Sequence, residues 1–311
     1  MAKGNMLLGY SRGSVGDVTF YRSGGSQRSR ARNRNPNNPR TERQQSQRSR
    51  FANAVKFYKQ VTTNFFRFAY EDKKVNESDY NAFMRHNTLR SGFIGAAASK
   101  IANWPALGAW EVTSGSLATI NNVFTSSEDY VFDVASAAPS ALTTIGALST
   151  YLINNDSDFR EGDIITALLY VVDDVSEASF PLPTIDTDNQ FNAGIAVMQF
   201  TLDSASTKTL ASITSSPAGF EYQFAHSVGE QGGLKVTFTG SEAPDFCQVA
   251  LIHSRQTGNG LLVSTQEMIA SSYTDNIVSS AMSESGAYYS AVIADWNAAP
   301  EAVLQGAASA N

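Results

Sequence analysis

Cysteine, histidine and long apolar runs are scarce in this chain of 311 residues. The single cysteine, Cys247, excludes a scaffold held together by disulfides within the chain, and its apolar neighbours predict a buried thiol. No apolar run reaches the roughly 18–20 residues that a membrane-spanning helix needs, and none follows Lys3 as in a secretion signal. We therefore expect no transmembrane segment, no membrane partner and no Sec-type signal peptide.

The three histidines show neither the spacing nor the surroundings of a catalytic site. His86 falls on the polar face of an expected helix, whereas His226 and His253 fall at the ends of expected strands, close to turns. No HExxH, CxxC or GxSxG motif accompanies them, so the signatures of common metal sites and nucleophile elbows are missing. We expect a structural or solvated role for each of the three histidines, no cofactor and no enzymatic activity.

Two acidic turns are weak candidates for a metal site. Asp156, Asp158, Glu161 and Asp163 lie in one turn, and Asp186 and Asp188 lie in another. Spaced carboxylates of this kind can hold Ca²⁺, but neither turn has the glycine and the terminal glutamate of the helix-loop-helix calcium loop. We interpret both turns as solvated loops, with arginines of a neighbouring subunit as a second possible partner.

Lysine and arginine are almost absent after residue 100. Residues 1–100 hold 19 Lys and Arg against 6 Asp and Glu, a net charge of +13, whereas residues 101–311 hold 4 against 23, a net charge of −19. The two values sum to the −6 of the whole chain. A segregation this strong indicates that the first third meets something negative. Nucleic acid and the acidic body of a neighbouring copy are both negatively charged and are the two candidate partners.

Arginine supplies most of this positive charge, with no lysine between residues 22 and 50. Guanidinium groups bind phosphate and carboxylate alike through paired N–H donors. No base-reading motif is present, so any binding of nucleic acid should be independent of sequence and sensitive to salt. The predicted contact residues are Arg22, Arg28, Arg30, Arg32, Arg34, Arg40, Arg43, Arg48 and Arg50.

Residues 14–32 predict a β-hairpin. Residues 17–22 are rich in β-branched and aromatic side chains, residues 23–26 (SGGS) supply the turn, and residues 27–32 return. The two-residue period of a strand places Arg28, Arg30 and Arg32 on one face. Such a row of arginines suits a phosphate backbone. The alternative is a solvated edge strand, whose charges prevent edge-to-edge pairing.

A small helical module should follow the hairpin. The pattern from Thr41 to Gln44 fits a capping box, and a second helix is expected over residues 77–87. An apolar stripe of the first helix predicts packing rather than base stacking, and Lys56 falls off that stripe. The small residues of 92–105 predict a linker or a closely packed segment. The stripe consists of Phe51, Val55, Tyr58, Val61, Phe65 and Phe68.

Strands dominate the remainder of the chain. Turn residues separate them, and the glycine-rich segment 229–235 is interpreted as a hairpin turn rather than a phosphate loop. Residues 138–154 and 266–283 are expected to be helical or irregular. The predicted strands are 109–113, 163–172, 195–202, 219–225, 233–239, 248–254, 261–265 and 287–294.

These patterns predict a mainly β chain with an N-terminal basic β-hairpin, a small helical module and a C-terminal β-sandwich or jelly-roll-like body. The expected division is a basic arm over residues 1–40, a helical module over 41–105 and an acidic β-rich body over 106–311, the last with one or two subdomains.

Three segments near the N-terminus carry a family resemblance. They read Gly13-x-Val15-Gly16-Asp17-Val18-x-Phe20-Tyr21-Arg22, then Arg30-x-Arg32-x-Arg34 with Asn38-Pro39-Arg40-Thr41, then Gln47-Arg48-x-x-Phe51-Ala52. Here the chain resembles an uncharacterised family of Bacteroidota and their associated phage genomes, which opens with a GKVGDVVFYR-type segment, then NPRT and a QR helix. Ser14 stands where that pattern usually has lysine. The resemblance covers about residues 10–90 and is looser beyond. It lends no catalytic residue and implies a virion component.

Our leading hypothesis is a non-enzymatic virion protein of a phage or virus, either capsid-type or minor, present in the host cytoplasm during assembly. Its basic N-terminal region would contact nucleic acid or acidic neighbouring subunits, and the chain would assemble with itself. The alternative is a non-structural, sequence-independent nucleic-acid-binding protein with a β-sandwich module for partner recognition. A hydrolase or lectin-like body that uses the acidic loops is a third hypothesis.

Overall fold

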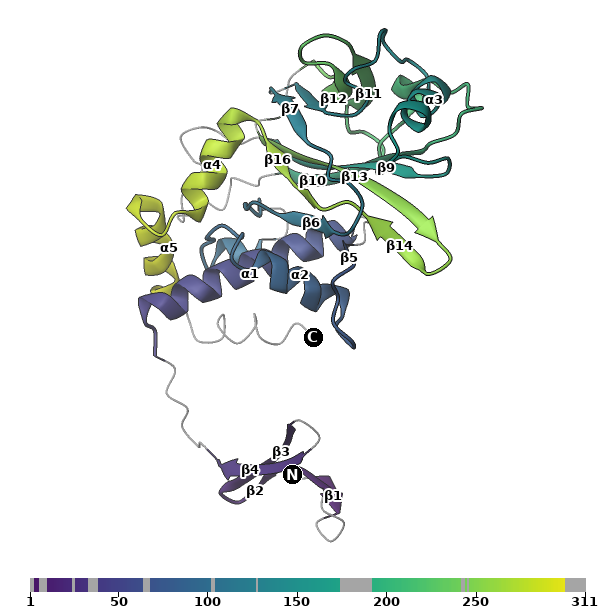
Figure 1. Ribbon diagram of the computed structural model, residues 1–311. Helices are drawn as coiled ribbons and strands as arrows, with labels where there is room; N and C mark the ends of the chain where they lie inside the picture. The colour runs from purple at the N-terminus through teal and green to yellow at the C-terminus, as the bar shows by residue number, and fades with distance from the viewer. Residues whose placement is uncertain are drawn as a thin grey trace. The chain divides into compact units, whose positions relative to one another are not determined.

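The computed structural model describes residues 3–5, 10–23, 26–32, 39–63, 68–101, 104–126, 128–173, 192–241, 244 and 246–299. The chain forms two compact units, Met1–Thr41 and Glu42–Asn311, which we describe separately (Figure 1). Strands predominate over helices and form open sheets, so the prediction of a mainly β chain with a β-rich body is confirmed. Among the described residues, no helix combines the length and the apolar character needed to cross a membrane.

The N-terminal unit is a four-stranded antiparallel sheet. Its strands β1 (Lys3–Asn5), β2 (Tyr10–Val15), β3 (Val18–Ser23) and β4 (Ser26–Ala31) pair in chain order. The predicted hairpin corresponds to β3 and β4, whereas β1 and β2 were not predicted. Gly16 has a φ of +56° in the tight turn between β2 and β3, a conformation that glycine adopts without strain. None of the described side chains of this unit is buried.

The second unit begins with the predicted helices. Helix α1 (Glu42–Thr63) starts directly after Thr41, as the capping pattern predicts. Helix α2 (Asp79–Asn87) is capped by Ser78, whose Oγ accepts a hydrogen bond of 3.2 Å from the backbone N–H of Asn81. The following segment is closely packed rather than a linker. It contains a 3-10 turn, η2 (Ala98–Lys100), and the buried side chains of Phe93 and Trp104.

A central sheet is buried on both faces. It consists of β10 (Asn192–Thr201), β9 (Ile164–Asp173), β13 (Phe246–Thr257) and β14 (Gly260–Val263), with β16 (Ile269–Ala270) paired to β13. Alternate residues of β9 enter two different cores: Leu168 and Tyr170 face the first, and Ile165 and Leu169 face the second. Burial on both faces explains why these strands read as continuous apolar runs.

A second sheet covers one face of the central sheet and encloses the second core. Its order is β11 (Tyr222–Ser227), β12 (Gly233–Phe238), β8 (Asp129–Phe132) and β7 (Asn122–Thr125). Helix α3 (Ile145–Asn155) and the 3-10 turn η3 (Leu210–Ser212) complete this core. Ser227 pairs with Gly233, which confirms that residues 229–235 include a hairpin turn.

Helices and a small third sheet cover the opposite face and enclose the first core (Figure 1). The sheet contains β15 (Gln266–Glu267), β6 (Glu111–Ser114) and β5 (Ala69–Tyr70). Helices α1, α2, α4 (Ser272–Met282) and α5 (Gly286–Ala298) supply the remaining side chains. The ring of Phe57 stacks on Trp110 with 4.3 Å between centroids, so residues 42–105 share a core with the β-rich body.

The prediction of a strand over residues 287–294 is wrong, because these residues lie in α5. Tyr289, Val292, Ile293 and Trp296 are buried at helical spacing. The run is rich in aromatic and β-branched residues, which resembles a buried strand when it is read without its tertiary neighbours. The placement of His253 at a strand end is also wrong. It lies inside β13 and is fully buried.

The apolar stripe predicted for α1 is only partly correct. Val61 and Phe68 are buried, but Phe51 is 37% exposed. Conversely, Lys56 is only 7% exposed, although it falls off the stripe. Phe65 lies outside the described residues. The buried face of α1 is mixed because it meets the backbone of residues 91–107: the Asn53 amide donates to the carbonyls of Gly92 and Leu107, at 3.0 and 2.6 Å.

Candidate functional site

One face of the N-terminal sheet carries arginine, tyrosine and hydroxyl side chains. Thr19 pairs with Ser14 on one side and with Arg30 on the other, so all three share a face. The Ser14 and Thr19 hydroxyl oxygens lie 2.9 Å apart, and the Arg30 guanidinium stacks over the Tyr21 ring, 5.6 Å from its centroid. Arg28 pairs with Tyr21 and is exposed. Arg28 and Arg30 therefore share one exposed face, as the strand period predicts.

The other face of this sheet is largely apolar. Val18 lies opposite Val15 on β2 and Ala31 on β4, and Phe20 lies one pleat further along. Val15 and Val18 are 53% and 39% exposed. The sheet is therefore amphipathic, and Arg28 and Arg30 lie on its polar side, whereas the register places Arg22 on the face of Val18 and Phe20.

The other predicted contact arginines fall into three groups. Arg32, Arg40 and Arg43 are exposed, and the Arg32 backbone N–H donates to the Asp17 carbonyl at 2.6 Å. Arg48 and Arg50 are partly buried on α1. The side chain of Arg22 and the whole of Arg34 lie outside the described residues.

Arg50 is held in place by several groups of the second unit. Its guanidinium donates to the carbonyls of Leu89 and Met282, both at 3.3 Å, and forms an ion pair of 3.1 Å with Glu284. It also stacks over the Phe93 ring, 4.6 Å from its centroid. This arginine therefore joins α1 to the segments that follow α2 and α4. Sequence charge alone did not distinguish it from the exposed arginines.

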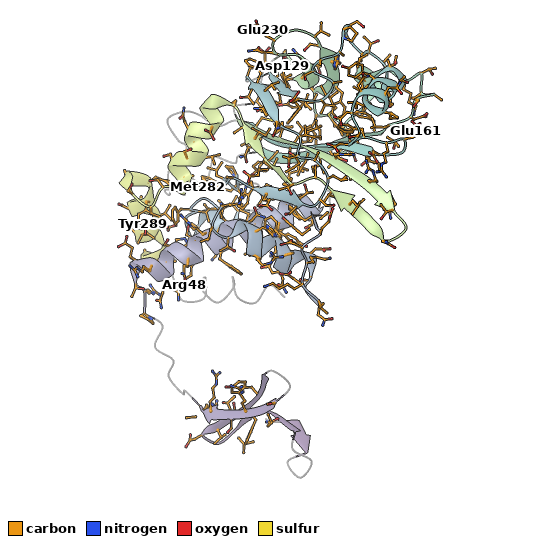
Figure 2. The ribbon with its side chains drawn as sticks, viewed as in Figure 1. Arg48, Asp129, Glu161, Glu230, Met282 and Tyr289 are labelled. Carbon is orange, nitrogen blue, oxygen red and sulfur yellow. The ribbon has the colours of Figure 1, made fainter. Side chains whose placement is uncertain are left out.

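A groove of about 1080 Å³ lies beside the N-terminal half of α1, and we call it the α1 groove. Thr88 and Leu89 after α2 and side chains of α5 complete its walls, and Figure 2 shows Arg48 on α1 and Tyr289 on the neighbouring α5. Phe51 and Leu89 are 37% and 78% exposed. Its lining includes Glu42, Arg43, Arg48, Arg50, Phe51, Leu89, Glu284 and Tyr289. Sequence reasoning found its arginines but not the groove itself.

Two clusters of ionisable groups were missed by the sequence analysis, the first buried and the second partly exposed. The first contains Asp163, so the prediction of a solvated turn is wrong at this residue. In the first, the Asp163 carboxylate accepts from His253 Nε2 at 2.8 Å and from Arg255 Nε and Nη2, both at 2.7 Å. Burial favours the neutral acid, but the Arg255 and His253 hydrogen bonds outweigh it and lower the Asp163 pKa. Burial lowers the pKa of His253. The ion pair is inaccessible, since Asp163 is 1% exposed, so it fixes β9 against β13.

In the second cluster, His86 bridges two carboxylates. Its Nδ1 lies 2.8 Å from Glu111 and its Nε2 lies 3.1 Å from Asp72. Arg90 also reaches Glu111, at 3.2 Å. His226 bonds to backbone groups: Nδ1 accepts from the Leu142 N–H at 3.1 Å, and Nε2 donates to the carbonyl of Ala135. All three histidines therefore hold elements together by hydrogen bonds.

Within the described residues, the carboxylates of the acidic turn around Asp156 do not gather into a metal-binding group. Asp156 Oδ1 accepts from the backbone N–H of Asp158 at 2.9 Å, which closes a turn. The described residues contain no group of three or more His, Cys, Asp or Glu side chains that could hold a metal ion. Asp186 and Asp188 lie outside the described residues.

Residues 10–159 match a family of unknown function (DUF6266). The match begins at β2 and ends just before β9, so it includes most of the basic sheet, α1 and α2, but not the central sheet. No curated protein and no solved structure matches the chain.

Proposed function

We propose that this chain is a non-enzymatic structural protein of a phage or virus particle and that its N-terminal sheet binds nucleic acid without reading its sequence. The arginine face of that sheet carries the proposal. Arg28, Arg30 and Arg32 are exposed on a unit whose only acidic residue is Asp17. A row of cations with so little negative charge in its own unit attracts an external polyanion. A phosphate backbone matches both the strand spacing and the guanidinium donors.

The charge of the second unit differs in sign from that of the N-terminal sheet. Residues 1–41 hold 8 Lys and Arg against 1 Asp, a net charge of +7, whereas residues 42–311 hold 15 against 28, a net charge of −13. Figure 2 shows the acidic side chains Asp129, Glu161 and Glu230 on the part of the second unit away from α1. A polyanion therefore attracts the sheet and repels the acidic side chains of this body.

The same charge difference supports a second candidate, in which the basic sheet docks on the acidic body of a neighbouring copy. That contact would also build an assembly, but its ligands would be carboxylates instead of phosphates. The two candidates differ in whether nucleic acid copurifies with the chain and whether it competes for the arginine face.

The salt dependence of DNA binding tests the proposal. Replacing Arg28, Arg30 and Arg32 by glutamine should lower the slope of log affinity against log salt by about 2–3, because each phosphate contact contributes about 0.9. The matched control replaces three exposed lysines of the second unit, Lys59, Lys100 and Lys208, and should leave the slope unchanged. An unchanged slope in the arginine variant would refute phosphate binding by this face.

Size-exclusion light scattering with absorbance at 260 and 280 nm separates the alternatives. Assemblies of many copies that contain nucleic acid support the virion role. Large assemblies without nucleic acid, dissociated by salt and by the arginine variant, support docking between subunits. A small species that binds DNA would instead indicate a non-structural nucleic-acid-binding protein.

A further inference from the structure

The α1 groove combines cationic and apolar groups in a way that the N-terminal sheet does not. Arg43 on the first turn of α1 is exposed, and Arg48 lies further along the same groove. Phe51 and Leu89, two of the exposed large apolar side chains of the second unit, line the same groove. Exposed apolar groups next to arginines are typical of the centre and rim of a protein interface.

Two buried polar atoms at this groove lack a hydrogen-bond partner. They are Nε of Arg50, a donor, and Oε1 of Gln44, an acceptor. Both residues line the groove. Most buried polar atoms of folded proteins are paired, and an unpaired one is costly. Both atoms are enclosed beneath the groove surface, so a ligand in the groove meets the exposed side chains above them.

The charges of the groove favour a peptide over nucleic acid. Its three arginines face two carboxylates, Glu42 and Glu284, and Arg50 is already paired with Glu284. A continuous phosphate backbone would pass both carboxylates, which costs repulsion at each. A peptide with separated acidic residues and apolar side chains between them avoids that repulsion. It also covers Phe51 and Leu89.

The chain itself contains a segment of this chemistry. Residues 174–191 (DVSEASFPLPTIDTDNQF) connect β9 to β10 and carry four carboxylates with no lysine or arginine. Phe180, Leu182 and Ile185 lie between the acidic residues, and Pro181 and Pro183 favour an extended conformation. The structure does not describe these residues, so their sequence alone enters the argument.

We propose that the α1 groove of one copy binds the 174–191 segment of a second copy. The carboxylates pair with Arg43 and Arg48, and the apolar residues cover Phe51 and Leu89. The groove and the segment are different parts of the same chain. A contact between the groove of one copy and the segment of the next is therefore head-to-tail and can propagate through many copies. The choice of a second copy rests on the assembly role proposed above, whereas the groove's preference for an acidic, apolar peptide does not.

Fluorescence anisotropy with a labelled synthetic peptide of residues 174–191 tests the site directly. The full chain should bind it at low salt, and Arg43→Gln with Arg48→Gln should weaken binding by about tenfold or more. Replacing Phe180 and Leu182 of the peptide by serine should weaken it similarly. The matched control, Lys100→Gln with Lys208→Gln, removes the same charge from exposed positions of the second unit that do not line the groove and should leave peptide binding unchanged.

Equal binding to the groove variant and to the unaltered chain would overturn the proposal, as would no binding at all. Light scattering at a series of protein concentrations tests whether the groove binds a second copy of the chain. Self-association should weaken in the groove variant, and a chain that stays monomeric at every concentration refutes the contact between copies. Because neither assay contains nucleic acid, failure here leaves the salt-slope test of the N-terminal sheet unaffected.

Discussion

Lys56 provides a quantitative test of how the first core is built. Its ammonium group is buried on α1 and donates to the carbonyl of Ile101. Burial lowers the pKa of Lys56 from 10.5 to about 8. At pH 7 the amine is charged in both the folded and the unfolded chain, so folding must remove a charge from water. The shift of 10.5 − 8 = 2.5 pKa units corresponds to about 3 kcal/mol of lost stability.

Replacing Lys56 by methionine should therefore stabilise the protein at pH 7. The gain is about 2 kcal/mol once the lost hydrogen bond to Ile101, worth about 1 kcal/mol, is subtracted. The folded pKa lies below the unfolded pKa, so the contribution of Lys56 to stability is complete above pH 10.5 and is lost as the pH falls through about 8. The advantage of the variant should thus shrink as the pH rises from 8 towards 10.5.

Urea unfolding followed by tryptophan fluorescence measures this difference. All three tryptophans, Trp104, Trp110 and Trp296, are buried in the same core as α1. Unfolding curves of the unaltered chain and of Lys56→Met at pH 7, 8.5 and 9.5 give the change in unfolding free energy at each pH. Lys59→Met is the matched control, because Lys59 is exposed on the same helix. No gain at pH 7, or a gain that does not depend on pH, would refute the reasoning.

Three further predictions concern buried groups. Asp163→Asn should lower the unfolding free energy by about 3–5 kcal/mol in urea, because it leaves Arg255 without its buried carboxylate; a loss below 1 kcal/mol would contradict this. Because burial lowers the His253 pKa, the unfolded chain takes up a proton first, so stability should fall below about pH 6.5. His253→Gln should flatten that part of a stability–pH curve, and an unchanged curve would exclude His253 as its cause. Cys247 is 3% exposed, so its thiol should react with an aromatic disulfide reagent only after denaturant is added; rapid reaction of the native chain would contradict its burial.

Local patterns were sufficient wherever neighbouring residues decide the structure. The hairpin over residues 14–32 follows from strand alternation around a glycine turn, and α1 starts where the capping pattern of Thr41 predicts. The strands of the central sheet were found because burial on both faces leaves continuous apolar runs. The same apolar signal led to the wrong prediction of a strand at residues 287–294, because a helix that is buried on most sides also has an apolar sequence.

For the candidate site, too, the sequence predicted what local periodicity decides and missed what tertiary packing decides. Arginines of β4 were placed on one face correctly because a strand has a fixed period. On α1, however, the helical period did not indicate which face would be buried. The partner surface there is polar backbone at Gly92, Ile94 and Leu107, which favours Ser49 and Asn53 over Phe51. Phe51 was thereby left exposed at the α1 groove.

By itself, the sequence determined the mainly β class, the charge separation and the identity of the arginines, because these depend on composition and on near neighbours in the chain. Only the tertiary structure decided which charges are solvated and which are buried. Asp163 and Arg255 are 92 residues apart in sequence, and they meet only because β9 pairs with β13. Arg50 and Glu284 likewise meet only where α1 packs near the end of α4. Contacts between distant segments depend on strand pairing and helix packing, and no local periodicity specifies those.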